Sequence, residues 1–73
     1  MNKTVAVFRS RNDTQRYYFA LRNAGINCKI ISTPIKIERS CGVSVLIKSS
    51  DRIKCENVLS RGKYYSFIGY FTI

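Results

Sequence analysis

The chain consists of two halves of similar length. Each half has one segment of helical periodicity between two segments of strand-like alternation. Gly, Asn, Asp, Ser or Pro residues separate these segments, as is typical of turns. In chain order the expected elements are a strand over Thr4–Phe8, a helix from Asp13 to a stop at Gly25, a strand over Ile26–Ile31, a strand over Gly42–Lys48, a helix from Ser50 to a stop at Gly62, and a last strand over Tyr64–Ile73. The predicted order is therefore β-α-β-β-α-β.

Two β-α-β halves of this length match the ferredoxin-like arrangement, in which a four-stranded antiparallel sheet carries two helices on one face. With right-handed crossovers, the third strand lies between the first and second strands and runs opposite to both. Its start, at Cys41 and Gly42, is then expected beside the end of the first strand and the N-terminus of the first helix. We therefore predict an α+β fold, a single ferredoxin-like βαββαβ domain over residues 1–73.

The ends of both helices carry recognisable capping residues. Asn12 and Gln15 predict a capping box at the first helix, and Ser50 is the expected N-cap of the second. Gly25 and Gly62 are the expected stops.

The net charge of +9 arises from thirteen Lys and Arg residues against four Asp and Glu residues. This balance favours anionic partners, such as nucleic acid, an acidic protein, a membrane surface or a small anion. The basic residues are scattered along the chain, so no run of them predicts a tail or a localisation signal. An ordinary solvated basic surface is the simpler interpretation of the charge.

The 73 residues contain three cysteines and no histidine. An odd number of cysteines, and an N-terminus that reads as a strand and not as a signal peptide, lead us to expect a reduced, cytoplasmic protein. The apolar runs are shorter than the roughly 20 residues that span a bilayer, so we expect no membrane segment. Without histidine or a C-x-x-C pair we expect no metal site, and nothing in the sequence predicts a cofactor.

Cys41 lies where a polar loop gives way to the third strand, and we interpret it as the candidate carrier thiol. The positive end of the first helix dipole favours a nearby anion such as a thiolate. Arg9 and Arg11 flank that helix end, and Arg39 lies two residues before the cysteine. Gly42 leaves room for a group that approaches the sulfur. Together with Ser40, these residues form the candidate set that supports the thiolate.

Cysteines are also common core residues, and this alternative stays open for Cys41, which could be a small hydrophobic residue at the start of the third strand. Cys28 falls on the inward side of its strand, and Cys55 on the apolar side of its helix. We expect both of these to be core residues.

The segment from Thr33 to Gly42 resembles the selenium/sulfur (Se/S) carrier-like family of small proteins. The matching residues are Thr33 and Pro34, Ile37, and the Ser40-Cys41-Gly42 run that opens the third strand, with further likeness in Phe8–Ser10 and Ala24–Ile26. Two positions depart from the family pattern. Ile35 stands where an arginine is usual and Glu38 where a serine is usual, while Lys36 and Arg39 supply nearby positive charge.

The resemblance implies that Cys41 carries sulfur or selenium as a persulfide or selenopersulfide, and that Thr33 and Pro34 belong to the motif loop. A carrier of this kind needs a sulfur or selenium donor that loads the thiol and an acceptor, a partner protein or a small molecule, that takes the outer atom. Such a protein is consumed and reloaded, so it is a carrier more than a turnover enzyme.

Two other readings stay open. The charge and fold class also suit a nucleic-acid-binding module, although the third strand lacks the aromatic residues that RNA recognition modules place there. The aromatic residues of the last strand, which is expected at a sheet edge, suit a protein-interaction module or a homodimer. The residues expected at that interface are Tyr64, Phe67, Tyr70 and Phe71.

Overall fold

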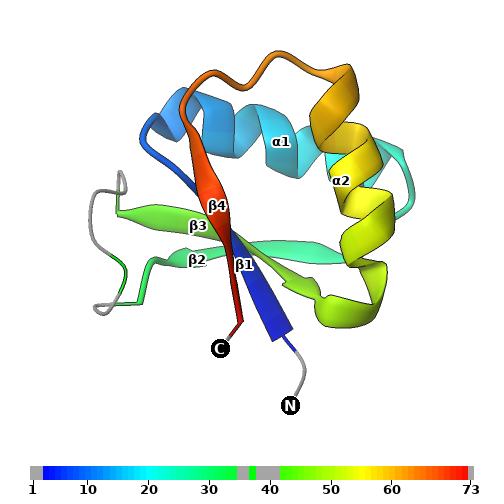
Figure 1. The fold of residues 1–73 in the computed structure, drawn as a ribbon, viewed down its shortest axis with the longest axis horizontal. Coiled ribbons are helices and arrows are strands. Elements are labelled where there is room, and N and C mark those ends of the chain that lie inside the picture. Colours follow the sequence, from blue (N-terminus) through cyan, green and yellow to red (C-terminus); the bar gives the residue numbers. More distant parts are fainter. Residues whose placement is uncertain (1–2, 35–36, 38–41, 73) are drawn as a thin grey trace.

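An antiparallel sheet of four strands, with two helices packed on one of its faces, makes up the fold (Figure 1). The structure is a computed structural model and describes residues 3–34, 37 and 42–72. The elements are β1 (Lys3–Phe8), α1 (Arg11–Asn23), β2 (Cys28–Ser32), β3 (Val43–Lys48), a 3-10 turn η1 (Ser49–Asp51), α2 (Arg52–Arg61) and β4 (Phe67–Thr72). The element order predicted from the sequence is confirmed.

The strands lie in the order β2-β3-β1-β4, and each neighbouring pair is antiparallel. β3 therefore lies between β1 and β2, as the handedness of the crossovers predicted. β4 lies at one edge of the sheet and β2 at the other. This is the ferredoxin-like topology expected from the sequence.

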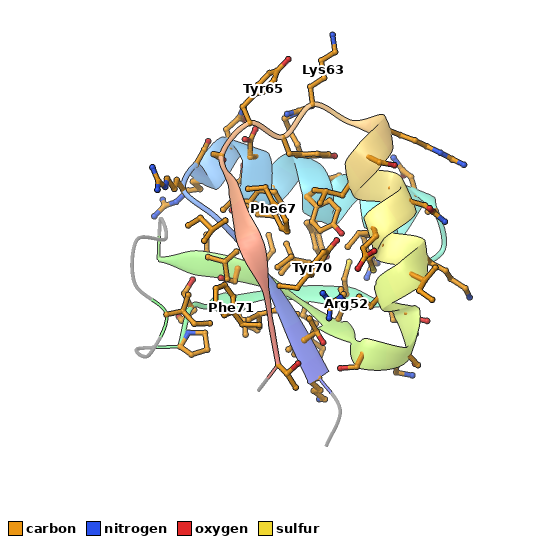
Figure 2. The ribbon with its side chains drawn as sticks, viewed as in Figure 1. Arg52, Lys63, Tyr65, Phe67, Tyr70 and Phe71 are labelled. Carbon is orange, nitrogen blue, oxygen red and sulfur yellow. The ribbon has the colours of Figure 1, made fainter. Side chains whose placement is uncertain are left out.

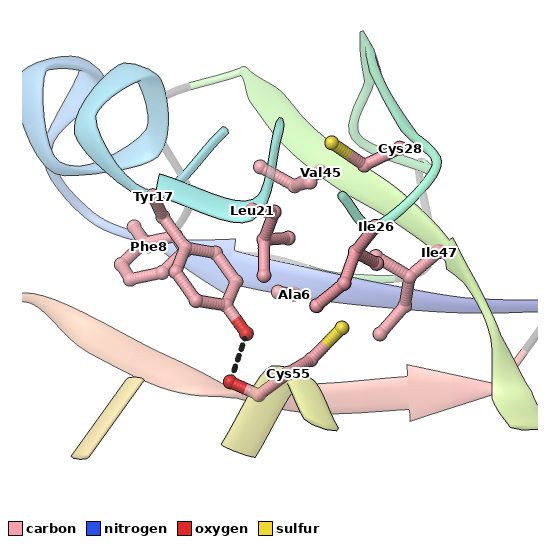
Figure 3. Packing of buried hydrophobic residues seen from close by; sticks show 9 residues of the cluster. All are labelled: Ala6, Phe8, Tyr17, Leu21, Ile26, Cys28, Val45, Ile47 and Cys55. Carbon is pink, nitrogen blue, oxygen red and sulfur yellow. Dashed lines mark hydrogen bonds between the residues drawn. The ribbon is translucent and has the colours of Figure 1, made fainter. Parts of the chain in front are cut away.

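The hydrophobic core lies between the helices and one face of the sheet (Figure 3). In β1 and β3 the residues that join this core recur at every second position, as strand geometry requires. The alternate β1 residues Val5 and Val7 are also fully buried, on the opposite face of the sheet. The buried residues of this cluster are Ala6, Phe8, Tyr17, Leu21, Ile26, Cys28, Val45, Ile47 and Cys55. α1 contributes Tyr17 and Leu21 to this cluster and also buries Thr14, whereas Cys55 is the one buried residue of α2.

The predicted start of α1 is wrong. The helix begins at Arg11, and its N-cap is Ser10, whose Oγ accepts a hydrogen bond from the Asp13 N–H at 3.3 Å. Ser10 has the extended backbone conformation of an N-cap residue, and its hydroxyl reaches the first helical turn. Asn12 lies inside the helix, so it cannot be the N-cap of a capping box with Gln15.

The predicted N-cap of α2 is also wrong, because Ser50 lies inside the 3-10 turn and the α-helix begins only at Arg52. Asp51 occupies the N-cap position without a side-chain capping bond. Both glycine stops are confirmed. Gly25 follows the last turn of α1 with a φ of +79°, which favours glycine, and the Gly62 N–H donates to the Val58 carbonyl oxygen.

β2 begins at Cys28, two residues later than expected. Ile30 is exposed because β2 forms an edge of the sheet that the helices do not cover completely. In the described parts of the chain, no helix is both long and apolar enough to cross a membrane.

Candidate functional site at the base of the loop between β2 and β3

The loop that carries the motif leaves the sheet from β2 and returns to it at β3. The last pair in the strand register is Ser32 with Val43, and one further pair closes the loop, because the Thr33 N–H donates to the Gly42 carbonyl oxygen at 3.0 Å. The Thr33 Oγ1 lies 2.6 Å from the Oγ of Ser44, a residue with no exposed surface. Backbone and side-chain hydrogen bonds therefore fix the base of the loop on both strands.

Thr33 has a definite structural role here that the motif alone did not reveal. Its hydroxyl is the hydrogen-bond partner of a buried serine, and a buried hydroxyl without a partner is costly. Pro34 follows at once, and its carbonyl oxygen accepts a bond from the Ile37 N–H at 2.9 Å, which forms a turn. Ser44 was missed by sequence reasoning; a lone serine in an apolar strand was the available signal.

Gly42 adopts a backbone conformation that side chains disfavour, with a φ of +98°. A Cβ placed on this residue would meet no atom within 4 Å, and the residue is exposed. The position next to Cys41 in the chain is therefore open to solvent and held in a conformation suited to glycine. Cys41, Ser40 and Arg39 themselves lie outside the described residues, as do Ile35, Lys36 and Glu38.

β3 begins at the end of the sheet where β1 finishes, as the topology predicted. Ser44 is the register partner of Val7, so Gly42 precedes the pairing of β3 with the last residues of β1. Arg9 and Arg11 follow β1 at this end, and both are exposed. The structure thus brings Gly42, Thr33 and the segment holding these two arginines to one end of the sheet (Figure 1).

A polar network occupies the N-terminus of α1 at the same end. The Asp13 Oδ2 accepts hydrogen bonds from the Ser66 N–H at 3.2 Å and the Ser66 Oγ at 2.7 Å, while its Oδ1 pairs with Arg16 at 3.1 Å. The Ser66 Oγ also accepts a bond from the Ser10 N–H. These hydrogen bonds, the one from the Ser66 side chain first, hold the pKa of Asp13 below its usual value.

This network changes the electrostatic picture drawn from the sequence. The Ser10 side chain caps the helix, and the Asp13 carboxylate already lies in its first turn. A negative side chain there offsets part of the positive potential that a thiolate would otherwise experience. The Ser10-x-x-Asp13 spacing was the sequence signal that could have identified this cap.

The two described cysteines are buried, as expected. Cys55 has no exposed surface and Cys28 is 6% exposed, and both thiols are free (Figure 3). Burial raises the pKa of Cys55 to about 11. Burial also raises the pKa of Cys28, although the Arg22 guanidinium opposes this shift. Neither thiol is a ready nucleophile at neutral pH, since the thiolate is the reactive form.

Metal ligands are not clustered in the described residues, where no group of three His, Cys, Asp or Glu side chains could hold an ion. The described polar groups at the base of the loop are hydroxyl groups and backbone amides, with the exposed Arg9 and Arg11 at the same end of the sheet.

Three of the four aromatic residues expected at a dimer interface pack inside the molecule. Tyr64 and Phe67 contact the ring of Phe8, with centroids 5.8 and 5.2 Å apart, and Tyr70 contacts Phe67 at 5.1 Å. Phe71 is 37% exposed (Figure 2). The homodimer stays a prediction. The apolar surface available for such an interface is mainly that of Phe71 and the outer edge of β4.

A family model described as "Putative Se/S carrier protein-like" matches residues 3–66. The match includes the motif loop and every element except β4. No curated protein and no solved structure matches the chain.

Proposed function

This chain belongs to the family described as putative Se/S carrier protein-like, and from that premise we propose that it carries one sulfur or selenium atom on the Cys41 thiol. One observation supports the choice of thiol. Cys28 and Cys55 are buried and have raised pKa values, so neither is suited to attack a donor in the folded protein. A carrier that works through a thiol is left with Cys41.

The proposed loading step is a thiol exchange with a persulfide donor. The Cys41 thiolate attacks the outer sulfur of the donor, a new sulfur–sulfur bond forms, the donor's own sulfur–sulfur bond breaks, and the donor thiolate leaves. Unloading reverses the roles: a nucleophile of the acceptor attacks the outer sulfur, and the Cys41 thiolate leaves. Transfer of selenium follows the same balance, with selenium as the outer atom and a sulfur–selenium bond in place of the sulfur–sulfur bond.

The geometry around Gly42 supports this proposal. The attacking Cys41 sulfur must approach in line with the donor's sulfur–sulfur bond. This approach requires free space beside the thiol for the donor. Gly42, the next residue in the chain, is exposed, and apart from its chain neighbours no described atom lies within 4 Å of the position that its Cβ would take. Thr33 holds the Gly42 carbonyl oxygen, so the strand that follows the thiol is anchored.

The electrostatic support is more modest than the sequence suggested. Arg9 and Arg11 lie exposed at this end of the sheet, where solvent screens their charges. The Asp13 carboxylate in the first turn of α1 opposes them. We therefore expect these charges to give a thiolate limited support, and the carrier to depend on its donor for docking.

The proposed partners are a donor protein that bears a persulfide or the selenium equivalent, and an acceptor that takes the outer atom. The surface is strongly basic, so complementary partners would be acidic at the contact. The protein is loaded and unloaded once per cycle and needs no cofactor of its own.

The deciding experiment treats the native protein with limiting iodoacetamide over a pH series and locates the modified cysteines by mass spectrometry. We expect Cys41 to react alone up to about pH 9, while Cys28 and Cys55 react only after denaturation. In parallel, glutathione persulfide should add one sulfur atom to Cys41 and none to the Cys41→Ser variant. Denatured wild-type protein serves as the control for full thiol access.

If Cys41 is as inert as the two core cysteines in the native state, the carrier proposal is wrong. The alternative is then a basic interaction module without thiol chemistry. If Cys41 reacts with iodoacetamide but takes up no sulfur, the thiol is exposed and the carrier role fails.

A further inference from the structure

A pocket of about 410 Å³ lies at the other end of the sheet from the motif loop, where β3 ends and β2 begins. Four of its lining residues carry positive charge and none carries negative charge. The pocket is lined by Lys3, Arg22, Lys29 and Lys48, together with Tyr18, Asn27, Cys28, Leu46 and Ile47. Its size falls within the range of about 300–1,000 Å³ found for small-molecule sites.

The sheet register places two of these lysines directly opposite each other. Lys3 on β1 and Lys48 on β3 are partners in the antiparallel ladder, and like charges in that position are destabilising. Lys29 on β2 pairs with Leu46, two residues before Lys48. β1, β3 and β2 therefore each bring one ammonium group to the same end of the sheet.

No acidic side chain in the described parts of the chain compensates this cluster. Within the described residues the ion pairs are Arg16 with Asp13 and Arg52 with Glu56. None of these four residues lines the pocket. An anionic ligand would relieve the repulsion between the lysines, and the same lysines would contribute to its binding.

α1 supplies a different kind of wall. The Arg22 guanidinium carbon lies 5.8 Å from the centroid of the Tyr18 ring, so the arginine packs against an aromatic face and its position is partly fixed. Cys28 lies beneath, where its Sγ donates to the Tyr18 carbonyl oxygen at 3.7 Å. Asn27 adds an amide that can donate a further hydrogen bond. Cys28 and Ile47 face the helices, so the strand alternation places Lys3, Lys29 and Lys48 on the opposite face of the sheet, while Arg22 lines the pocket from the α1 side.

We propose that this pocket binds a small phosphorylated compound that carries two or more negative charges. The ammonium groups of the three lysines match the charge of phosphate oxygens, and the Arg22 guanidinium on the α1 side can bind a second phosphate oxygen pair. The concave, partly apolar lining favours a compact ligand over an extended chain. The site is separate from Cys41, because it lies at the far end of β3, and it stands or falls independently of the carrier function.

The test uses pyrophosphate as the probe, with binding measured by calorimetry at low ionic strength and mapped by amide chemical shifts. We expect saturable binding and shift changes at Lys3, Asn27, Lys29 and Lys48. Single variants Lys29→Gln and Lys48→Gln should each weaken binding about fivefold, the loss of one close charge pair in water. Added salt should weaken binding further.

Lys54→Gln and Lys63→Gln are the matched controls, since both lysines are exposed and neither lines the pocket. Lys63 lies in the segment between α2 and β4 (Figure 2). Each removes the same charge, and we expect unchanged affinity. Circular dichroism of every variant confirms that the fold is kept.

Equal weakening in the control variants, or shift changes spread over the whole surface, would show a general effect of net charge and overturn the proposal. A single-stranded oligonucleotide forms the second arm of the test. If the oligonucleotide binds at these residues while pyrophosphate shows no saturable binding, the surface contacts nucleic acid and the small-molecule site is refuted.

Discussion

The Tyr17 hydroxyl on α1 donates a hydrogen bond to the Cys55 carbonyl oxygen on α2 at 2.9 Å (Figure 3). Its oxygen also lies 2.8 Å from the Tyr70 hydroxyl on β4. Because the Tyr17 proton is engaged by the carbonyl, Tyr70 is the donor in the second bond. One phenol thus joins both helices to the edge strand within the core, where its ring is fully buried.

Tyr17→Phe should therefore destabilise the fold by about 1–3 kcal/mol, because the Tyr70 hydroxyl loses its partner in a largely apolar setting. Urea unfolding measures this change. Tyr65→Phe is the matched control, since Tyr65 is 87% exposed, and should leave the free energy of unfolding nearly unchanged. Equal effects in the two variants would show that the buried phenol network contributes little.

Thr33→Val keeps the shape of the side chain and removes its hydroxyl, so the buried Ser44 Oγ loses the partner at 2.6 Å. We expect a loss of about 1–3 kcal/mol in the free energy of unfolding. Thr72→Val, at the exposed end of β4, is the control and should change stability by less than about 0.5 kcal/mol. If both variants are neutral, Thr33 does not fix the base of the loop.

Gly42→Ala tests the link between backbone conformation and the thiol. Apart from its chain neighbours, no described atom lies within 4 Å of the new methyl group, so we expect the positive φ to account for the cost, about 1–2 kcal/mol. Gly25→Ala imposes a similar strain at a φ of +79°, after α1. We expect similar losses of stability in the two variants, but an altered rate of Cys41 alkylation only in Gly42→Ala. An unchanged rate of Cys41 alkylation in Gly42→Ala would show that the conformation of Gly42 does not affect the reactivity of the thiol.

Acid should weaken the fold through Asp13. Its hydrogen bonds to Ser66 hold the folded-state pKa below the ordinary 3.8, so as the pH falls the unfolded state takes up the proton first. The stabilisation is complete above about pH 5 and is lost as the pH falls through the folded-state pKa. Urea unfolding across this range should show a steeper decline for wild type than for Asp13→Asn.

Glu56→Gln is the control for the acid experiment. Glu56 pairs with Arg52 at an exposed site, where such a pair contributes about 0–1 kcal/mol. Its acid dependence should stay close to that of wild type. The explanation through Asp13 fails if the Asp13→Asn variant declines as steeply as wild type.

The expected homodimer has a direct test in the mass of the intact protein in solution. β4 is an edge strand, and Phe71 next to its end is partly exposed. We expect a dimer mass by light scattering for wild type and a monomer mass for Phe71→Arg, with Tyr65→Arg as the control for added charge. A monomer mass for wild type at every concentration would rule out the dimer.

The sequence by itself determined the order and type of the elements, the two glycine stops and the burial of Cys28 and Cys55. These features depend on periodicity and backbone preference within a few residues, which are visible in a single segment of chain. The short spacing of the elements and the handedness of the crossovers then determined the strand order.

Only the tertiary structure decided which polar groups meet. Asp13 and Ser66 are 53 residues apart, as are Tyr17 and Tyr70, and Lys3 faces Lys48 across the sheet. These pairs depend on strand register and on the angle at which helices pack, and no local pattern specifies either. The Ser10 cap of α1 had a local signal in the Ser10-x-x-Asp13 spacing, whereas the bonds that join Ser10 and Asp13 to Ser66 needed the loop before β4.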